Sequence, residues 1–139
     1  MVSDSTVPPL WQLPPVLAAF DNLRGFRSRT IVLARAIPSE PARAIAIAAR
    51  VHGAAIGIGA TLVLRVWPAA PTDEDPAQDF LGPAPLAQLA LEAVAAPGLA
   101  RTVLLPPLPP ALQLQLTAQQ PALGVACRAT ISAVVTAIA

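Results

Sequence analysis

Most of the chain after residue 27 alternates between apolar and polar or small positions, which is typical of β-strands with one buried face. A first run, from Ser28 to Ile37, ends at Pro38. A second run spans residues 44–52, and its alternate positions are the apolar set Ile45, Ile47, Ala49 and Val51. Because β-branched side chains dominate that face, the pattern predicts a strand rather than a helix.

A third run begins at Ile56 and ends before Pro68, with apolar residues at every even position up to Val66. The glycines in Gly57-Ile58-Gly59 leave two interpretations. Either the run is one continuous strand, or these residues form a loop or bulge that divides it.

The C-terminal third contains three more predicted strands. Residues 99–105 precede a Pro-rich stretch at 106–110, which is unsuited to a central strand. Leucines at 112, 114 and 116 alternate with polar residues, which predicts a half-buried strand, and a final strand falls within residues 124–139, with the apolar face Val125, Cys127, Ala129, Ile131, Ala133 and Val135. Residues 86–96 fit a short helix or a strand equally well.

Six or seven short strands with Pro-rich connections and almost no predicted helix indicate an all-β fold. We expect an antiparallel β-sandwich, jelly-roll-like in its topology, over residues 27–139.

Residues 1–26 differ from this domain. Two Pro-Pro pairs, at 8–9 and 14–15, favour an extended, polyproline-like backbone, so we predict an extended Pro-rich N-terminal arm outside the core. One interpretation is a terminus packed locally on its own domain. The other is an arm that anchors on another subunit through its large apolar side chains, and the partner-binding candidates are then Leu10, Trp11, Leu13 and Phe20.

Composition adds an argument about assembly. The 139 residues are 55% hydrophobic and 12% charged, with a mean hydropathy of +0.61, which is unusually apolar for a domain of this size. Exposed apolar surface marks interfaces, so we expect a homo-oligomer or lattice-bound copies. All nine basic residues are Arg, and the net charge of +1 provides no strong field to attract nucleic acid.

The residues that bear reactive groups are few. One Cys and one His exclude a disulfide framework within the chain and any site that needs two imidazoles, so we expect no metal and no cofactor. Cys127 lies on the apolar face of its strand and His52 at a strand end, and nothing in the sequence places them together, so we expect no catalysis. Residues 57–59 lack the Lys and third Gly of a phosphate loop.

Four acids fall between residues 73 and 79, but their spacing does not match an EF-hand, so we predict a solvated surface loop rather than a calcium site. The most apolar stretch, residues 44–64, contains Arg50, His52 and three glycines, which argues against a membrane span. The N-terminal residues lack the features of a secretory signal. We therefore expect synthesis in a cytoplasm and no membrane partner.

The order of these features from residue 43 to 139 resembles the small β-sandwich capsid decoration, or cement, proteins of tailed bacteriophages. The stretches that carry the resemblance are Ile45–Ile47, Gly57–Leu64, the acidic insertion at 73–79, Arg101–Leu104 before Pro106-Pro107, and Leu112–Thr117 followed by Gly124-Val125 and a long final strand. The resemblance concerns pattern and order and includes no invariant motif. The Pro-rich arm and the absence of Lys are not part of it.

The resemblance implies a virion protein, made in the host cytoplasm, that binds the major capsid protein and reinforces contacts between capsomers without an active site or cofactor. Two alternatives stay open at this point. One is a structural tail or connector component of the same particle. The other is a carbohydrate- or receptor-binding β-sandwich, although such sites usually stack sugars on aromatic rings and this chain has two Trp, three Phe and no Tyr.

Overall fold

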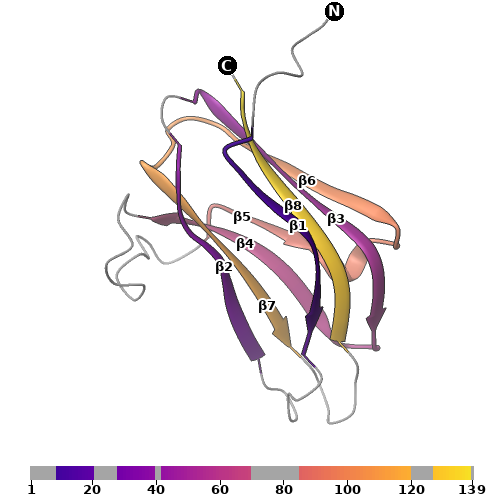
Figure 1. Ribbon diagram of the computed structural model, residues 1–139. Coiled ribbons are helices and arrows are strands. Elements are labelled where there is room, and N and C mark those ends of the chain that lie inside the picture. The colour runs from indigo at the N-terminus through magenta and orange to yellow at the C-terminus, as the bar shows by residue number, and fades with distance from the viewer. Residues whose placement is uncertain (1–8, 21–27, 40–41, 70–84, 120–126, 139) are drawn as a thin grey trace, which may run out of the picture.

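The computed structural model describes residues 9–20, 28–39, 42–69, 85–119 and 127–138. They form eight strands and one short 3₁₀ helix, shown in Figure 1: β1 (Trp11–Ala19), β2 (Ser28–Pro38), β3 (Ala44–Ile56), β4 (Thr61–Ala69), β5 (Ala87–Ala90), η3 (Leu91–Ala93), β6 (Gly98–Leu104), β7 (Ala111–Gln119) and β8 (Cys127–Ile138).

The strands build two four-stranded sheets. Sheet A has the order β1-β8-β3-β6 and sheet B the order β2-β7-β4-β5, and every pair is antiparallel. Strand β1 pairs with β8, β2 with β7, β3 with β6 and β4 with β5. This is the pairing of one long antiparallel hairpin, with its tip between β4 and β5, rolled into two layers, which is the jelly-roll topology. The predicted antiparallel β-sandwich is confirmed.

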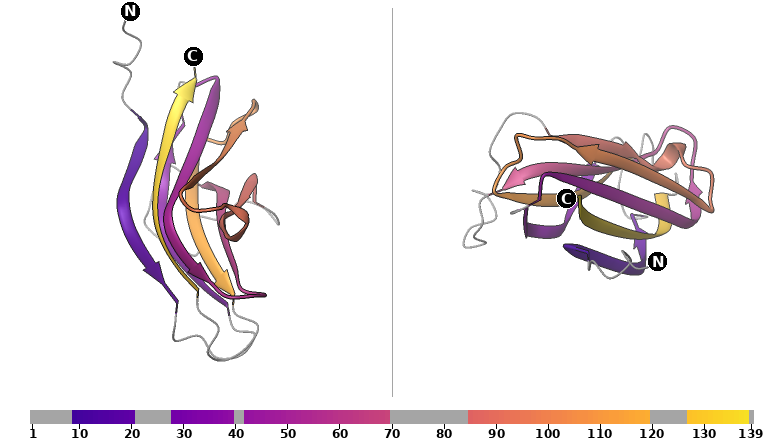
Figure 2. Two further views of the ribbon diagram at one scale, coloured as in Figure 1. Left: turned by 90° about the vertical axis from the view of Figure 1, so that its right-hand side faces the viewer. Right: turned by 90° about the horizontal axis from the view of Figure 1, so that it is seen from above.

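The core lies between the two sheets, whose strands curve along their length (Figure 2). Strand β3 contributes the apolar face predicted from the sequence, and β8 contributes Cys127, Ile131 and Val135 beside it. Sheet B meets them with Leu62, Leu64, Val66, Leu112, Leu114 and Leu116, all of them at most 1% exposed. Full burial of a Leu or Ile side chain stabilises a fold by about 1.5–3 kcal/mol, so this double layer is the main source of stability.

The stretch with two interpretations, Gly57-Ile58-Gly59, divides the third apolar run. The Ala60 N–H donates to the Gly57 carbonyl oxygen over 3.1 Å, and Gly59 has a φ of 86°. A positive φ at the third residue of a turn is typical of type II and favours glycine. The turn carries the chain from β3 in sheet A to β4 in sheet B, so Ile56 and Thr61 belong to different sheets.

The prediction of an arm outside the core is wrong for the described residues 9–20. Strand β1 is an edge strand of sheet A, with Trp11 opposite Val135 and Ala18 opposite Ala129 on β8. The Pro-Pro pair at 14–15 does keep the backbone extended, as predicted, but an edge strand tolerates proline because one side of it needs no ladder hydrogen bonds. The register shifts between Leu13 and Val16, where the two prolines lie.

Residues 86–96 form neither one short helix nor one strand throughout: they contain the four-residue strand β5 and the three-residue 3₁₀ turn η3. The Leu62 N–H donates to Glu92 Oε1 over 2.9 Å, which fixes η3 against the start of β4. The predicted acidic loop at 73–79 and Val125 lie outside the described residues.

Strand β7 was predicted to be half-buried, and this is wrong, because it is buried on both faces. Gln113 and Gln115 point away from the core yet are 1% and 6% exposed. In the register, Trp67 and Arg65 of β4 lie directly opposite them, and cross-strand neighbours approach within about 5 Å between Cβ atoms. Long side chains on a flanking strand thus help to cover positions that alternation alone assigns to solvent.

Candidate interaction surface

The outer face of sheet A exposes large apolar side chains. Leu17 on β1 is 64% exposed, and Leu99 and Val103 on β6 are 47% and 45% exposed. Between them, β3 presents Ala46 and Ala48. Successive side chains of a strand point to opposite faces of the sheet, so these residues point away from the core and contribute nothing to the interior. Exposed apolar surface of this kind is typical of interaction sites.

A groove crosses this face. It has a volume of about 500 Å³, and its lining includes Pro14 and Pro15 of β1, Leu99 of β6, and the small side chains of Ala48 on β3 and Ser132 on β8. The small side chains of Ala48, Ser132 and Ala133 on the two central strands leave room between the larger side chains of the two edge strands. A smaller hollow of about 170 Å³ continues on the same face near Leu17, Gly53 and Thr130.

The charges on this face are positive. Arg50 on β3 also lines the groove, and Arg101 on β6 lies one diagonal step away, because Arg50 pairs with Leu99 and Ala48 pairs with Arg101. Both side chains are exposed. No ion pair joins either of them to another residue in the described part of the chain, so sheet A carries two neighbouring cationic groups among apolar side chains.

His52 lies beside Arg50 on the same face, within β3 rather than at the strand end that the sequence predicts. The strand is longer than expected because the register shift between Val51 and Gly53 lets it continue to Ile56. His52 Nε2 and Ser132 Oγ form a hydrogen bond of 2.8 Å across β3 and β8. Cys127 is fully buried in the core, where its Sγ lies 3.7 Å from the Thr61 carbonyl oxygen, so the imidazole and the thiol lie on opposite faces of sheet A.

The outer face of sheet B has a different character. Gln115 Nε2 donates to Gln113 Oε1, and Gln113 Nε2 donates to the Arg35 carbonyl oxygen over 3.5 Å. Arg65 Nε donates to Gln88 Oε1 over 3.0 Å. The polar side chains of this sheet therefore bind to one another and to their own backbone.

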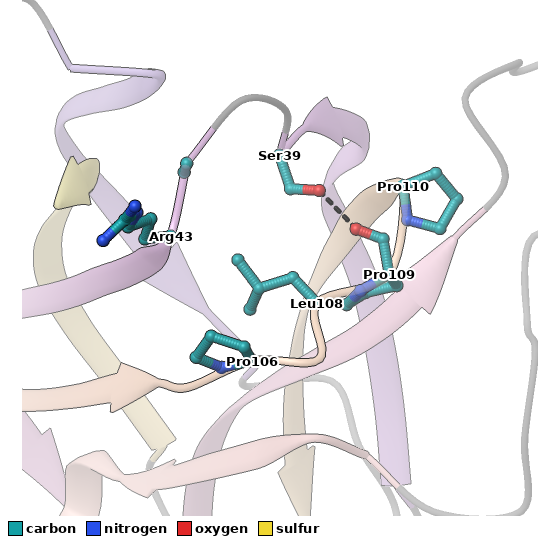
Figure 3. Close-up of a pocket in the computed structure, with 7 residues that line it drawn as sticks. Ser39, Arg43, Pro106, Leu108, Pro109 and Pro110 are labelled. Atoms are coloured by element: carbon teal, nitrogen blue, oxygen red, sulfur yellow. Dashed lines mark hydrogen bonds between the residues drawn. The ribbon is translucent and has the colours of Figure 1, made fainter. Parts of the chain in front are cut away.

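A second hollow lies at one end of the sandwich, between the β2–β3 and β6–β7 connections (Figure 3). Its volume is about 450 Å³, and it is lined by Arg43, Leu108 and three prolines at 106, 109 and 110. The Ser39 hydroxyl donates to the Pro109 carbonyl oxygen and the Ser39 N–H donates to that of Pro110 over 3.2 Å, so the two connections are held together.

The four predicted partner-binding residues are not brought together on one surface. Phe20 is 1% exposed and belongs to this chain's own core, and Leu10 and Trp11 pack against that core. Leu13 is half-buried and lines the groove on sheet A. The positions of Leu10, Trp11 and Phe20 agree with the first of the two interpretations, a terminus packed locally on its own domain. The sequence did not indicate Arg50, Leu99 and Arg101, because the adjacency of β3 and β6 is set by topology.

The described residues contain no cluster of three or more His, Cys, Asp or Glu side chains that would hold a metal ion. No helix among them is long and apolar enough to cross a membrane.

Neither a protein-family model nor a curated protein sequence matches this chain.

Proposed function

We propose that the chain is a structural protein of a bacteriophage particle, bound to the capsid lattice as a decoration protein and acting without catalysis. The observation that carries the proposal is the outer face of sheet A, where Leu17, Leu99 and Val103 are exposed beside a groove. An exposed apolar face on a rigid sandwich is suited to a stable protein contact. The jelly-roll topology adds an analogy, because the same fold recurs in viral capsid domains.

Stabilisation of a shell follows from mass action. A protein that binds two neighbouring capsid subunits favours their assembled state by its binding free energy, and this gain is repeated at every site on the lattice. Such a protein needs rigidity and a contact surface. The two-layer core provides the first and the outer face of sheet A the second.

The test is cryo-electron microscopy of the native particle produced by the genome that encodes this chain. We expect density for the sandwich at regular positions over an icosahedral shell, and we expect shells that lack the chain to break at a lower temperature. A ring of copies in the tail would support the connector alternative instead. Absence from every particle would refute both.

A further inference from the structure

We propose that the outer face of sheet A is the surface that docks on the shell, and that the segment it binds belongs to a capsid subunit and combines an apolar side chain with carboxylates. This inference rests on the proposed function and adds to it the docking face and the chemistry of the partner. It is carried by Arg50 and Arg101 beside the groove.

The two arginines favour an acidic partner. Arg50 and Arg101 occupy diagonal positions on neighbouring strands, at a separation of about 7–8 Å between backbone sites, so their like charges repel each other. Neither has a counter-ion in the described part of the chain. Arginine binds carboxylates with paired hydrogen bonds, so an acidic segment laid across β3 and β6 satisfies both groups at once.

The shape of the groove favours an apolar side chain. Leu99 stands opposite Arg50 in the register, and Ala48 and Ser132 form the shallow part of the groove between it and the proline pair of β1. A side chain of Leu or Phe size fits such a hollow. Burial of an apolar anchor flanked by charge-assisted hydrogen bonds is the usual arrangement of a strong interface site.

The described surfaces of this chain do not offer that partner to a second copy. Among the described residues the one acid is Glu92, and its Oε1 accepts the Leu62 N–H. The exposed edge of β1 is also a poor template for strand addition, because Pro14 and Pro15 interrupt its N–H groups. The other seven acids of this chain lie outside the described residues, so a second copy that binds through them is one of the outcomes of the cross-linking experiment below.

The first experiment measures binding of purified variants to native shells stripped of this chain, by co-sedimentation. We expect Arg50→Glu/Arg101→Glu to bind at least about tenfold more weakly, because two charge-assisted contacts become repulsive. The matched control, Arg29→Glu/Arg43→Glu, makes the same change of net charge at exposed positions away from this face and should bind as the unmodified chain does. Thermal unfolding of each variant establishes that the folds are equivalent. Equal binding by both double variants would overturn the inference.

The second experiment places a photo-reactive benzoyl-phenylalanine at position 99 in the assembled particle, with position 32 as the control. Leu99 and Val32 have similar exposure, 47% and 40%, but lie on opposite sheets. We expect cross-links from position 99 to an acid-containing segment of a capsid subunit. Cross-links to another copy of this chain, or a yield no higher than at position 32, would refute the docking assignment.

The two proposals fail in different ways. If microscopy finds the sandwich on the shell but bound through sheet B or an end of the domain, the decoration role stands and the docking inference is wrong. If no shell carries the chain, the decoration role itself is wrong.

Discussion

The two outer faces of this sandwich are built from strands of the same kind and have opposite properties. On sheet A, the outward positions carry exposed Leu, Val and Ala together with three exposed arginines, Arg50, Arg101 and Arg128. On sheet B, the outward positions carry glutamines and threonines that bind one another, and Val32 is the one exposed large apolar side chain on its described strands. Apolar surface exposed to water is unfavourable unless something covers it, whereas a satisfied polar surface is stable in water. This difference is the basis of our proposal that sheet A is the face that binds a partner.

The largest effect that this comparison predicts is a loss of stability from the Gln113→Ala change. The substitution removes the acceptor of the Gln115 side chain and leaves a buried amide unsatisfied, which costs about 1–3 kcal/mol. Urea unfolding followed by circular dichroism measures it. The matched control is Gln12→Ala, an outward and exposed glutamine on sheet A. A surface position of this kind should change stability by less than about 0.5 kcal/mol, and equal losses at both sites would remove the distinction between the faces.

A smaller effect concerns two side-chain pairs, one on each face. Thr30 and Thr117 hydroxyl oxygens lie 3.0 Å apart on sheet B, and His52 and Ser132 are 2.8 Å apart on sheet A. Cross-strand pairs of this type contribute about 0.2–1 kcal/mol each. Double-mutant cycles with Thr30→Val/Thr117→Val and His52→Ala/Ser132→Ala should give coupling energies within that range for both. A coupling of zero on sheet B would contradict the view that its polar surface is held by its own contacts.

The smallest effect is electrostatic, and it is a gain in stability rather than a loss. Arg101→Gln removes one of two neighbouring positive charges on sheet A, so the free chain should become slightly more stable at low ionic strength. The gain should vanish as added salt screens the repulsion. Thermal unfolding at low and high salt measures it. Arg65→Gln on sheet B is the comparison, because Arg65 donates to Gln88 and its loss should produce no gain.

The fold was largely predictable from the sequence because it depends on local alternation. The Ile45–Val51 face and the Cys127–Val135 face are buried as predicted, since a strand exposes every second residue to one side whatever sheet it joins. The error at Gln113 and Gln115 has a tertiary cause, namely long side chains on the neighbouring strand.

The candidate surface was less predictable. Arg50 and Arg101 are far apart in the chain, and their adjacency depends on the pairing of β3 with β6. Phe20 shows the reverse error. Its place in a Pro-rich segment suggested an anchor on another subunit, but its side chain is buried in the core of its own chain. Local composition establishes that a side chain is apolar but does not establish which surface covers it.

The nested pairing of the strands also determines how the chain reaches its native state. Of the four nested pairs β1–β8, β2–β7, β3–β6 and β4–β5, the last joins the strands that are closest in sequence, whereas β1 joins β8 across almost the whole described chain. Non-local pairings must close long loops before they gain any contact energy, so such topologies fold slowly. During synthesis β1 stays without its partner strand until β8 has left the ribosome. The proline pair of β1 then discourages premature pairing with other nascent chains, so the residues that shape the groove in the finished molecule also protect it from aggregation while it is made.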